Sequence, residues 1–195
     1  MHGAVRPRSA LPRSPTLHGA RHGLDRLNSA VPGAAEAALL ACCGSRRWAR
    51  QLAVGRPYPD LAALLRAADR AAHVLTPADL AEALADERGP YPALARRAGP
   101  GISGGSAALA ALTRGQAAYE HRFGHAFVLC LDGCRPAEAL DRALAALRSR
   151  LGGSVAEEAA TTAVELARLA RGRLIRLAPD IPCTRSHDTP QHHGT

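Results

Sequence analysis

Apolar residues recur at steps of three and four through most of the chain between residues 33 and 177, with polar and charged residues between them. This spacing places the apolar side chains on one face of a helix that packs on a core. Ser45, Asp60 and Ser154 stand directly before such stretches and are typical N-cap residues. Helices are expected over residues 33–43, 45–55, 60–75, 76–87, 106–123, 136–152 and 154–177. The pattern therefore predicts an all-α fold with a single compact multi-helix domain.

The two ends of the chain differ from this pattern because they are rich in Pro, His, Ser and Thr. We expect a disordered basic leader over residues 1–27, a folded domain over residues 28–178 and a disordered tail over residues 179–195. Residues 89–105 form the longest irregular segment inside the domain, and loops of this length are usually functional or disordered. Residues 127–131 are apolar with β-type side chains, but this run is too short to predict a sheet.

The last expected helix carries an arginine on its apolar face. The residues that share this face, at steps of three and four, are Val155, Ala159, Thr162, Leu166, Leu169, Arg173 and Leu177. An inward guanidinium is costly unless a carboxylate, carbonyl groups or an anionic ligand satisfies it. Two interpretations of Arg173 are therefore open: a structural ion pair, or an anchor for an anionic substrate.

Composition excludes several classes of function. Hydrophobic residues make up 47% of the chain and aromatic residues only 3%, so Leu, Ala and Val must build the core. All 25 basic residues are Arg, which excludes a Schiff-base lysine and a phosphate-binding loop of the Gly-Lys-Ser/Thr type. The net charge of +8 lies partly in the leader and is otherwise scattered among acidic residues, so no nucleic-acid partner is predicted. No apolar run approaches the length of a membrane span, so no membrane partner is predicted either.

The chain has five cysteines and no recognisable signal peptide. This combination is typical of a reduced cytoplasmic protein whose thiols are free and mostly buried. Cys130 and Cys134 lie near His125 and are spaced like a metal-binding pair, but no second pair of ligands follows at the expected spacing. We therefore expect structural thiols and no metal site.

Three segments carry a resemblance to a known family. Residues 41–58 hold Cys-Cys-x-Ser-x-x-Trp leading into Arg-Pro-Tyr. Residues 119–130 begin Tyr-Glu-His-Arg-Phe-Gly-His-Ala-Phe-Val, and near the end Glu165-Leu166 is followed by Arg173-Leu174. Together they resemble 2-oxo-4-hydroxy-4-carboxy-5-ureidoimidazoline (OHCU) decarboxylase over roughly residues 27–177.

The resemblance implies an all-helical enzyme that needs neither metal nor organic cofactor. Members of this family are commonly dimeric, which makes a homodimer one expected assembly. They remove the carboxylate of OHCU as carbon dioxide and deliver a proton to one face, which gives (S)-allantoin in urate degradation, a part of purine metabolism. The implied partner is therefore a small-molecule ureide or urate-pathway intermediate. Positioning and electrostatics dominate such a reaction, because the substrate's own ring takes up the electron pair.

The resemblance also assigns site residues. The segment whose backbone faces the substrate in the family matches Gly124, His125, Ala126, Phe127 and Val128. Arg173 matches the active-site arginine. An ungapped alignment places Glu87 where the family has the His of a His-Pro-x-x-Gly motif, and Ser103 at the Ser of a Ser-x-x-Glu-Gln motif whose Glu and Gln are absent here.

Two residues are candidates to carry the proton in place of the missing histidine. Glu87 stands at its position, and His125 belongs to the substrate-facing segment, although a partly exposed structural role is the alternative for His125. Removal of a general acid or base typically slows a reaction by about 10²–10⁴-fold. Two hypotheses follow: a decarboxylase with a different proton carrier, or a non-catalytic paralogue that keeps the fold and a ureide-binding pocket or dimer surface.

Overall fold

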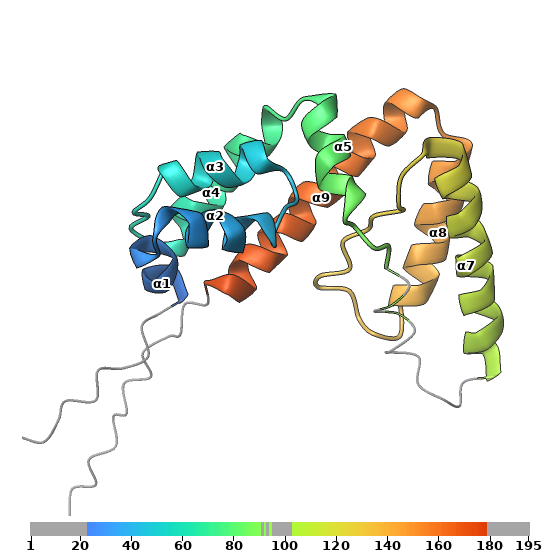
Figure 1. Ribbon diagram of the computed structural model, residues 1–195. Helices are drawn as coiled ribbons and strands as arrows, with labels where there is room; N and C mark the ends of the chain where they lie inside the picture. Colours follow the sequence, from blue (N-terminus) through green and yellow to red (C-terminus); the bar gives the residue numbers. More distant parts are fainter. Residues whose placement is uncertain (1–22, 91, 93, 95–102, 179–195) are drawn as a thin grey trace, which may run out of the picture.

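The computed structural model describes residues 23–90, 92, 94 and 103–178, the last range without the side chains of residues 103–106. Within these ranges the chain forms eight helices and no strand, which confirms the all-α prediction (Figure 1). The helices are α1 (Gly23–Ser29), α2 (Pro32–Leu40), α3 (Arg46–Val54), α4 (Leu61–His73), α5 (Pro77–Ala85), α7 (Ser103–Phe123), α8 (Ala139–Gly152) and α9 (Val155–Leu177). None of them combines the length and the apolar character needed to cross a membrane. The disorder predicted for residues 1–22 and 179–195 concerns residues outside the described ranges.

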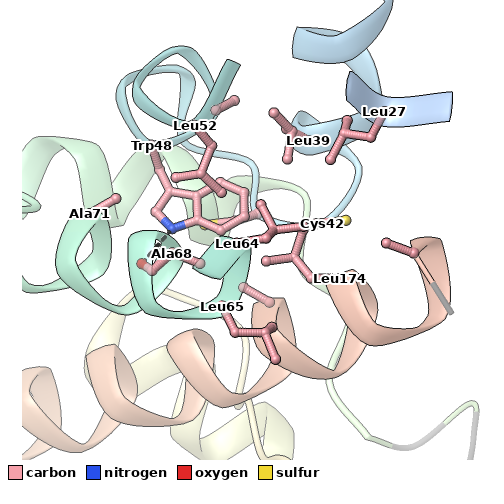
Figure 2. Close-up of a cluster of buried hydrophobic side chains, with 14 of the residues drawn as sticks. Leu27, Leu39, Cys42, Trp48, Leu52, Leu64, Leu65, Ala68, Ala71 and Leu174 are labelled. Atoms are coloured by element: carbon pink, nitrogen blue, oxygen red, sulfur yellow. Dashed lines mark hydrogen bonds between the residues drawn. The ribbon is translucent and has the colours of Figure 1, made fainter. Parts of the chain in front are cut away.

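The first hydrophobic core lies between α1–α4 and the C-terminal half of α9. Trp48, Leu64 and Leu174 are fully buried there (Figure 2). The indole Nε1–H of Trp48 donates a hydrogen bond of 3.1 Å to the carbonyl of Ala68, so the one polar group of the ring is satisfied. The Cys-Cys and Trp residues that carry the resemblance are thus packing residues of this core.

The second hydrophobic core lies between α7, α8 and the extended residues 127–129. Its largest fully buried side chains are Tyr119, Phe127 and Leu112. Figure 1 shows α9 running from the α1–α4 group to the region of α7 and α8. The N-terminal half of α9 contributes Glu158 to a buried ion pair with Arg150 of α8. One long helix therefore joins the two cores.

Several helices begin at the predicted caps. The side-chain oxygens of Ser45, Asp60 and Ser154 accept hydrogen bonds from backbone N–H groups of the first helical turns. By contrast, α8 begins at Ala139 and not at Pro136, because residues 136–138 form a separate turn. The helix that the sequence places at residues 106–123 begins three residues earlier, at the start of α7.

Residues 23–27 were predicted to belong to the disordered leader, and this prediction is wrong because α1 begins at Gly23. Leu24 and Leu27 are buried in the first core. Asn28 exchanges two hydrogen bonds with the backbone of Tyr58, of 2.8 and 2.9 Å. Tertiary contacts therefore hold this short helix, and the local sequence pattern does not show them.

The buried face of α9 is rotated relative to the predicted stripe. Its buried residues include Glu158, Thr162, Glu165, Leu166, Ala170 and Leu174. Val155, expected on the buried face, is 70% exposed, and Arg173 lies beside that face with its side chain 31% exposed. The polar members are buried because each has a hydrogen-bonding partner from another element or from α9 itself, a condition that apolar periodicity cannot detect.

Because α9 joins the two cores, we expect truncation of two neighbouring side chains of this helix to lower the free energy of unfolding by different amounts. Leu174→Ala removes a fully buried side chain and should lower the free energy of unfolding by about 2–5 kcal/mol in urea titrations. Ile175→Ala, on the adjacent 44% exposed side chain, is the matched control and should cost about 1 kcal/mol or less. Equal losses for the two variants would show that the first core does not include this face of α9.

Candidate functional site

An ion pair joins Glu87, two residues after the end of α5, to Arg173 in the C-terminal half of α9. The two Nη atoms of Arg173 donate hydrogen bonds of 2.5 and 2.8 Å to the two carboxylate oxygens of Glu87. Nη1 also donates a bond of 3.1 Å to the carbonyl of Cys42, after α2. The structure thus brings together the two residues assigned to the family's acid/base and arginine positions, and each satisfies the charge of the other.

Both members of this pair are shielded from solvent to different degrees. The Glu87 side chain is 8% exposed, and the Arg173 side chain is 31% exposed. The hydrogen bonds from Arg173 to Glu87 raise the pKa of the guanidinium, so Arg173 stays charged. Burial raises the pKa of the thiols of Cys42 and Cys43, which keeps the neighbouring double cysteine protonated and unreactive. The charged residues that line the cavity here are Asp86 and Arg88 together with the Glu87–Arg173 pair.

Two cavities meet at Glu87. The smaller, about 450 Å³, is lined by residues of the α2–α3 connection and by Asp86, Glu87 and Arg173. The larger, about 760 Å³, is lined by apolar residues of α5 together with Glu87, His125 and Thr162. Both volumes fall in the range of about 300–1,000 Å³ that is usual for small-molecule sites. Glu87 lines both cavities, whereas Arg173 lines only the smaller one.

The predicted substrate-facing segment has two parts, of which one lines a cavity and the other has buried side chains. Gly124, His125 and Ala126 line the larger cavity. The side chains of Phe127 and Val128 are buried in the core, so only their backbone is a candidate for ligand contact. Ser103 is the first residue of α7, and its side chain lies outside the described residues.

The ring of His125 is held by its surroundings. Nδ1 lies 3.1 Å from the carbonyl of Ala126, and the ring packs edge-on against Tyr119 with centroids 5.5 Å apart. A carbonyl only accepts, so Nδ1 carries the hydrogen in this contact, and Nε2 has no hydrogen-bond partner among the described residues. His125 therefore has one nitrogen available for proton exchange.

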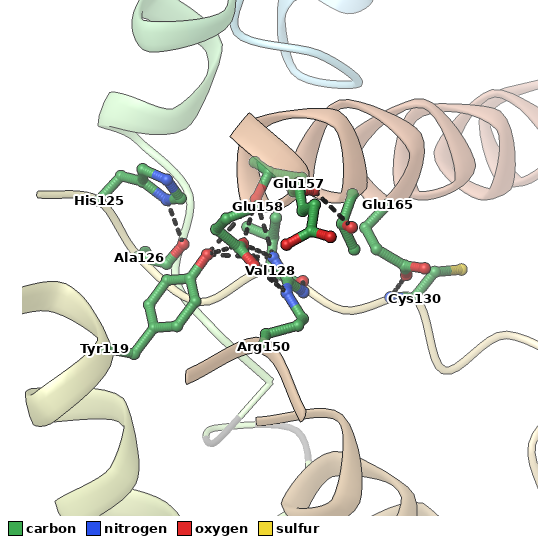
Figure 3. A network of polar contacts seen from close by, with 11 residues as sticks. Tyr119, His125, Ala126, Val128, Cys130, Arg150, Glu157, Glu158 and Glu165 are labelled. Atoms are coloured by element: carbon green, nitrogen blue, oxygen red, sulfur yellow. Dashed lines mark hydrogen bonds and ion pairs between the residues drawn. The ribbon is translucent and has the colours of Figure 1, made fainter. Parts of the chain in front are cut away.

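A buried polar network lies beside the larger cavity, and the sequence analysis did not predict it. The network consists of Tyr119, Arg150, Glu158 and Thr162 (Figure 3). Arg150 Nε donates to both carboxylate oxygens of Glu158 at 3.0 Å, and its Nη1 donates a bond of 2.6 Å to the carbonyl of Val128. The one sequence signal is the pairing of an acidic and a hydroxyl residue four positions apart on the first half of α9.

Burial and hydrogen bonding set the charges of this network. Burial, together with the bond to Glu158, raises the pKa of Tyr119 to about 12, so the phenol stays neutral. Burial also opposes ionisation of Glu158, but hydrogen bonds from Arg150, Tyr119 and Thr162 outweigh it and hold the pKa of Glu158 below its ordinary value of 4.5. The network is therefore a charged Arg–Glu pair with neutral hydroxyl partners.

The thiols predicted to be free are so in the described part of the chain, where Cys42, Cys43, Cys130 and Cys134 form no disulfide. Among the same residues, no group of three or more His, Cys, Asp or Glu side chains is arranged to hold a metal ion. Cys130 instead uses its backbone N–H, which donates a bond of 2.7 Å to Glu165.

Fold and site together define an all-helical protein with an arginine–carboxylate pair beside cavities of small-molecule size. A sequence profile described as OHCU decarboxylase matches residues 28–175, and the chain therefore belongs to the OHCU decarboxylase family. No curated protein matches the sequence.

Two solved structures share the fold. A crystal structure of OHCU decarboxylase in the presence of (S)-allantoin is 24% identical with a TM-score of 0.60, and the match covers 72% of this chain and 96% of that one. A crystal structure of (S)-allantoin synthase is 16% identical, also with a TM-score of 0.60, and the match covers 80% of this chain and 54% of that one.

The charge state of Glu158 predicts a pH dependence. Its pKa is lower in the folded than in the unfolded chain, so its contribution to stability is complete above pH 4.5 and is lost as the pH falls through the folded value. Glu158→Gln should lower the free energy of unfolding by about 3 kcal/mol at pH 7, because Arg150 loses its buried counter-charge. The difference between the two proteins should shrink below pH 4.5 in urea titrations.

The other acidic groups contribute equally to the pH dependence of the wild type and of Glu158→Gln, so they do not affect the difference between the two proteins. Hydrogen bonds from Thr76 and Ser154 lower the pKa values of Asp79 and Glu157, but these two carboxylates are unchanged in the variant. A difference that stays constant from pH 7 to pH 3 would mean that Glu158 is not ionised in the folded protein.

Proposed function

We propose that this chain decarboxylates a carboxylated ureidoimidazoline of the OHCU type to (S)-allantoin, with Arg173 as the carboxylate anchor and Glu87 as the proton carrier. The observation that carries the proposal is the two-point pairing of these side chains at the meeting point of the two cavities. A guanidinium that already binds one carboxylate in this geometry has the geometry to bind another. Family membership supports the choice of substrate.

The proposed first step is an exchange of partners at Arg173. The carboxylate of the substrate takes the place of Glu87 on the guanidinium. Glu87 then stands in a largely buried position beside a second anion and without its cation. Loss of the cation, burial and a like charge all favour the protonated form of a carboxyl group. Glu87 therefore takes up a proton when the substrate binds.

The second step breaks the bond between the ring carbon and the carboxylate. Carbon dioxide leaves, and the electron pair stays on the ring carbon, delocalised into the ring and its substituents. Glu87 donates its proton to this carbon from one face, which makes the product a single enantiomer. The resulting carboxylate of Glu87 pairs with Arg173 again when the product leaves, so charge and protons balance over the cycle.

His125 has a supporting position in this scheme. It lines the same large cavity as Glu87, and the contact between its Nδ1 and Ala126 leaves Nε2 free to exchange protons. We assign it the delivery of a proton to Glu87 when the substrate takes the place of Glu87 on Arg173. The backbone of residues 124–128 completes the proposed binding surface for the polar ring and the ureido group, and Ser103 stays a candidate that rests on the resemblance alone.

The same ion pair favours a second candidate function. Glu87 and Arg173 satisfy each other fully, so a chain that never exchanges these partners would be a non-catalytic paralogue with the fold of the family. Such a protein would bind neutral ureides without accelerating decarboxylation. The two candidates differ in the stereochemistry of the product.

The test follows product stereochemistry by circular dichroism. OHCU is generated from urate in the presence of the purified chain, and the signal of (S)-allantoin is compared with the racemic product of the spontaneous reaction. The wild type should give an excess of (S)-allantoin. Glu87→Gln should lower the rate of (S)-allantoin formation by about 10²–10⁴-fold, because the proton carrier is lost, and Arg173→Ala should abolish it.

The matched control is Glu82→Gln. Glu82 is a carboxylate of α5 that pairs with Arg46 at a distance of 3.2 Å, and it lines neither cavity. This variant should keep the wild-type rate. A racemic product from the wild type at the spontaneous rate would overturn the proposal in favour of the non-catalytic function. Full activity of Glu87→Gln would instead refute the role of Glu87 alone.

A further inference from the structure

Residues 124–130 begin with a bend at Gly124 and His125 and then belong to no helix or strand. The first three of them, Gly124, His125 and Ala126, line the larger cavity. Backbone N–H and C=O groups of such a segment must find other partners when they are buried. Here two side-chain systems supply them. Arg150 donates to the carbonyl of Val128, and Glu165 accepts from the N–H of Cys130 at 2.7 Å.

Resting on the proposed function, we infer that the buried network of Tyr119, Arg150, Glu158 and Thr162 is a positioning device that fixes the 124–130 segment as the binding surface for the substrate. Arg150 reaches the backbone at Val128, and Glu158 fixes the orientation of Arg150 through bonds to two of its nitrogens. These residues act through the segment and not on the reacting atoms. They are therefore positioning residues.

Tyr119 connects the network to the side chains of the segment. Its hydroxyl donates to Glu158 and accepts from Arg150 Nη2 at 3.0 Å. Its ring packs edge-on against His125 and against Phe127, with centroids 5.5 and 5.1 Å apart. One buried residue thus touches both the charged pair and the two ring side chains that flank Ala126.

Energetics favour positioning over stabilisation as the purpose of this network. A buried ion pair stabilises a fold no more than apolar residues of the same volume, because desolvation costs as much as the attraction returns. The rest of this core is built from Leu, Ala and aromatic side chains that would accept such a replacement. An apolar replacement would not bind the carbonyl of Val128. The polar network therefore supplies a directional contact that packing alone cannot.

The network also reaches the ligand cavity directly. Glu158 and Thr162 line the 760 Å³ cavity together with Gly124, His125 and Ala126. A shift of the segment would change the shape of this cavity, which Glu87 also lines. Loss of one network bond should therefore weaken substrate binding more than it slows the chemical step.

The test compares two buried tyrosines. Tyr119→Phe removes a hydroxyl of the network and keeps the ring, whereas Tyr58→Phe removes the hydroxyl of another buried tyrosine, which donates a bond of 2.9 Å to the carbonyl of Leu52 in the first core. Tyr119→Phe should raise KM for OHCU about tenfold with kcat within about twofold of the wild type. Tyr58→Phe should leave KM unchanged at a similar loss of stability.

Amide hydrogen exchange of peptides covering residues 124–131 gives a readout that does not depend on activity. Exchange there should rise at least tenfold in Tyr119→Phe and stay at the wild-type rate in Tyr58→Phe. Equal effects of the two variants on exchange or on KM would overturn the inference. An inactive wild type would refute the proposed function, and the exchange comparison would then decide the positioning role by itself.

Discussion

The interaction on which this site depends is the two-point ion pair between Glu87 and Arg173. It fixes the chain after α5 against α9, and through the carbonyl of Cys42 it also holds the end of α2. A mostly buried carboxylate at this place would be unfavourable without such a partner. The pair therefore fixes the local structure, and in the proposed function a ligand carboxylate takes the place of Glu87 on Arg173.

Helix α9 joins this pair to the rest of the molecule. Its C-terminal half fills the first core with Leu166, Ala170 and Leu174, and its N-terminal half presents Glu158 to the second core. One helix thus carries both Arg173, the proposed ligand anchor, and Glu158, a member of the buried network. Glu158 lines the larger cavity, and so does Glu87, the partner of Arg173.

Much of the fold follows from local signals in the sequence. Helix periodicity and the capping residues Ser45, Asp60 and Ser154 place most of the helices, because these effects act within one turn. Helix α1 could not be predicted in this way, because hydrogen bonds to the backbone of Tyr58 and packing in the first core stabilise it, and its own apolar pattern does not indicate a helix. Sequence motifs likewise bring Glu87 and Arg173 to one site, but their direct pairing is a tertiary fact.

The buried face of α9 shows a different limit of sequence reasoning. Glu158 and Glu165 occupy it because Arg150 and the N–H of Cys130 satisfy their charges. Apolar periodicity assigns such positions to solvent and shifts the predicted stripe toward Val155, which is exposed. The burial of these two carboxylates depends on their hydrogen-bond partners, which lie more than seven residues away along the chain. A pattern within one helix does not contain this information.

In the proposed function Glu87 and a ligand carboxylate compete for Arg173, and calorimetric titration measures this competition. Wild type and Glu87→Gln are each titrated with allantoate, which carries a carboxylate, and with (S)-allantoin, which does not. Removing the competing charge should tighten the binding of allantoate by about tenfold or more and change the binding of (S)-allantoin little. Allantoate binding that is unchanged or weaker in Glu87→Gln would contradict the claim.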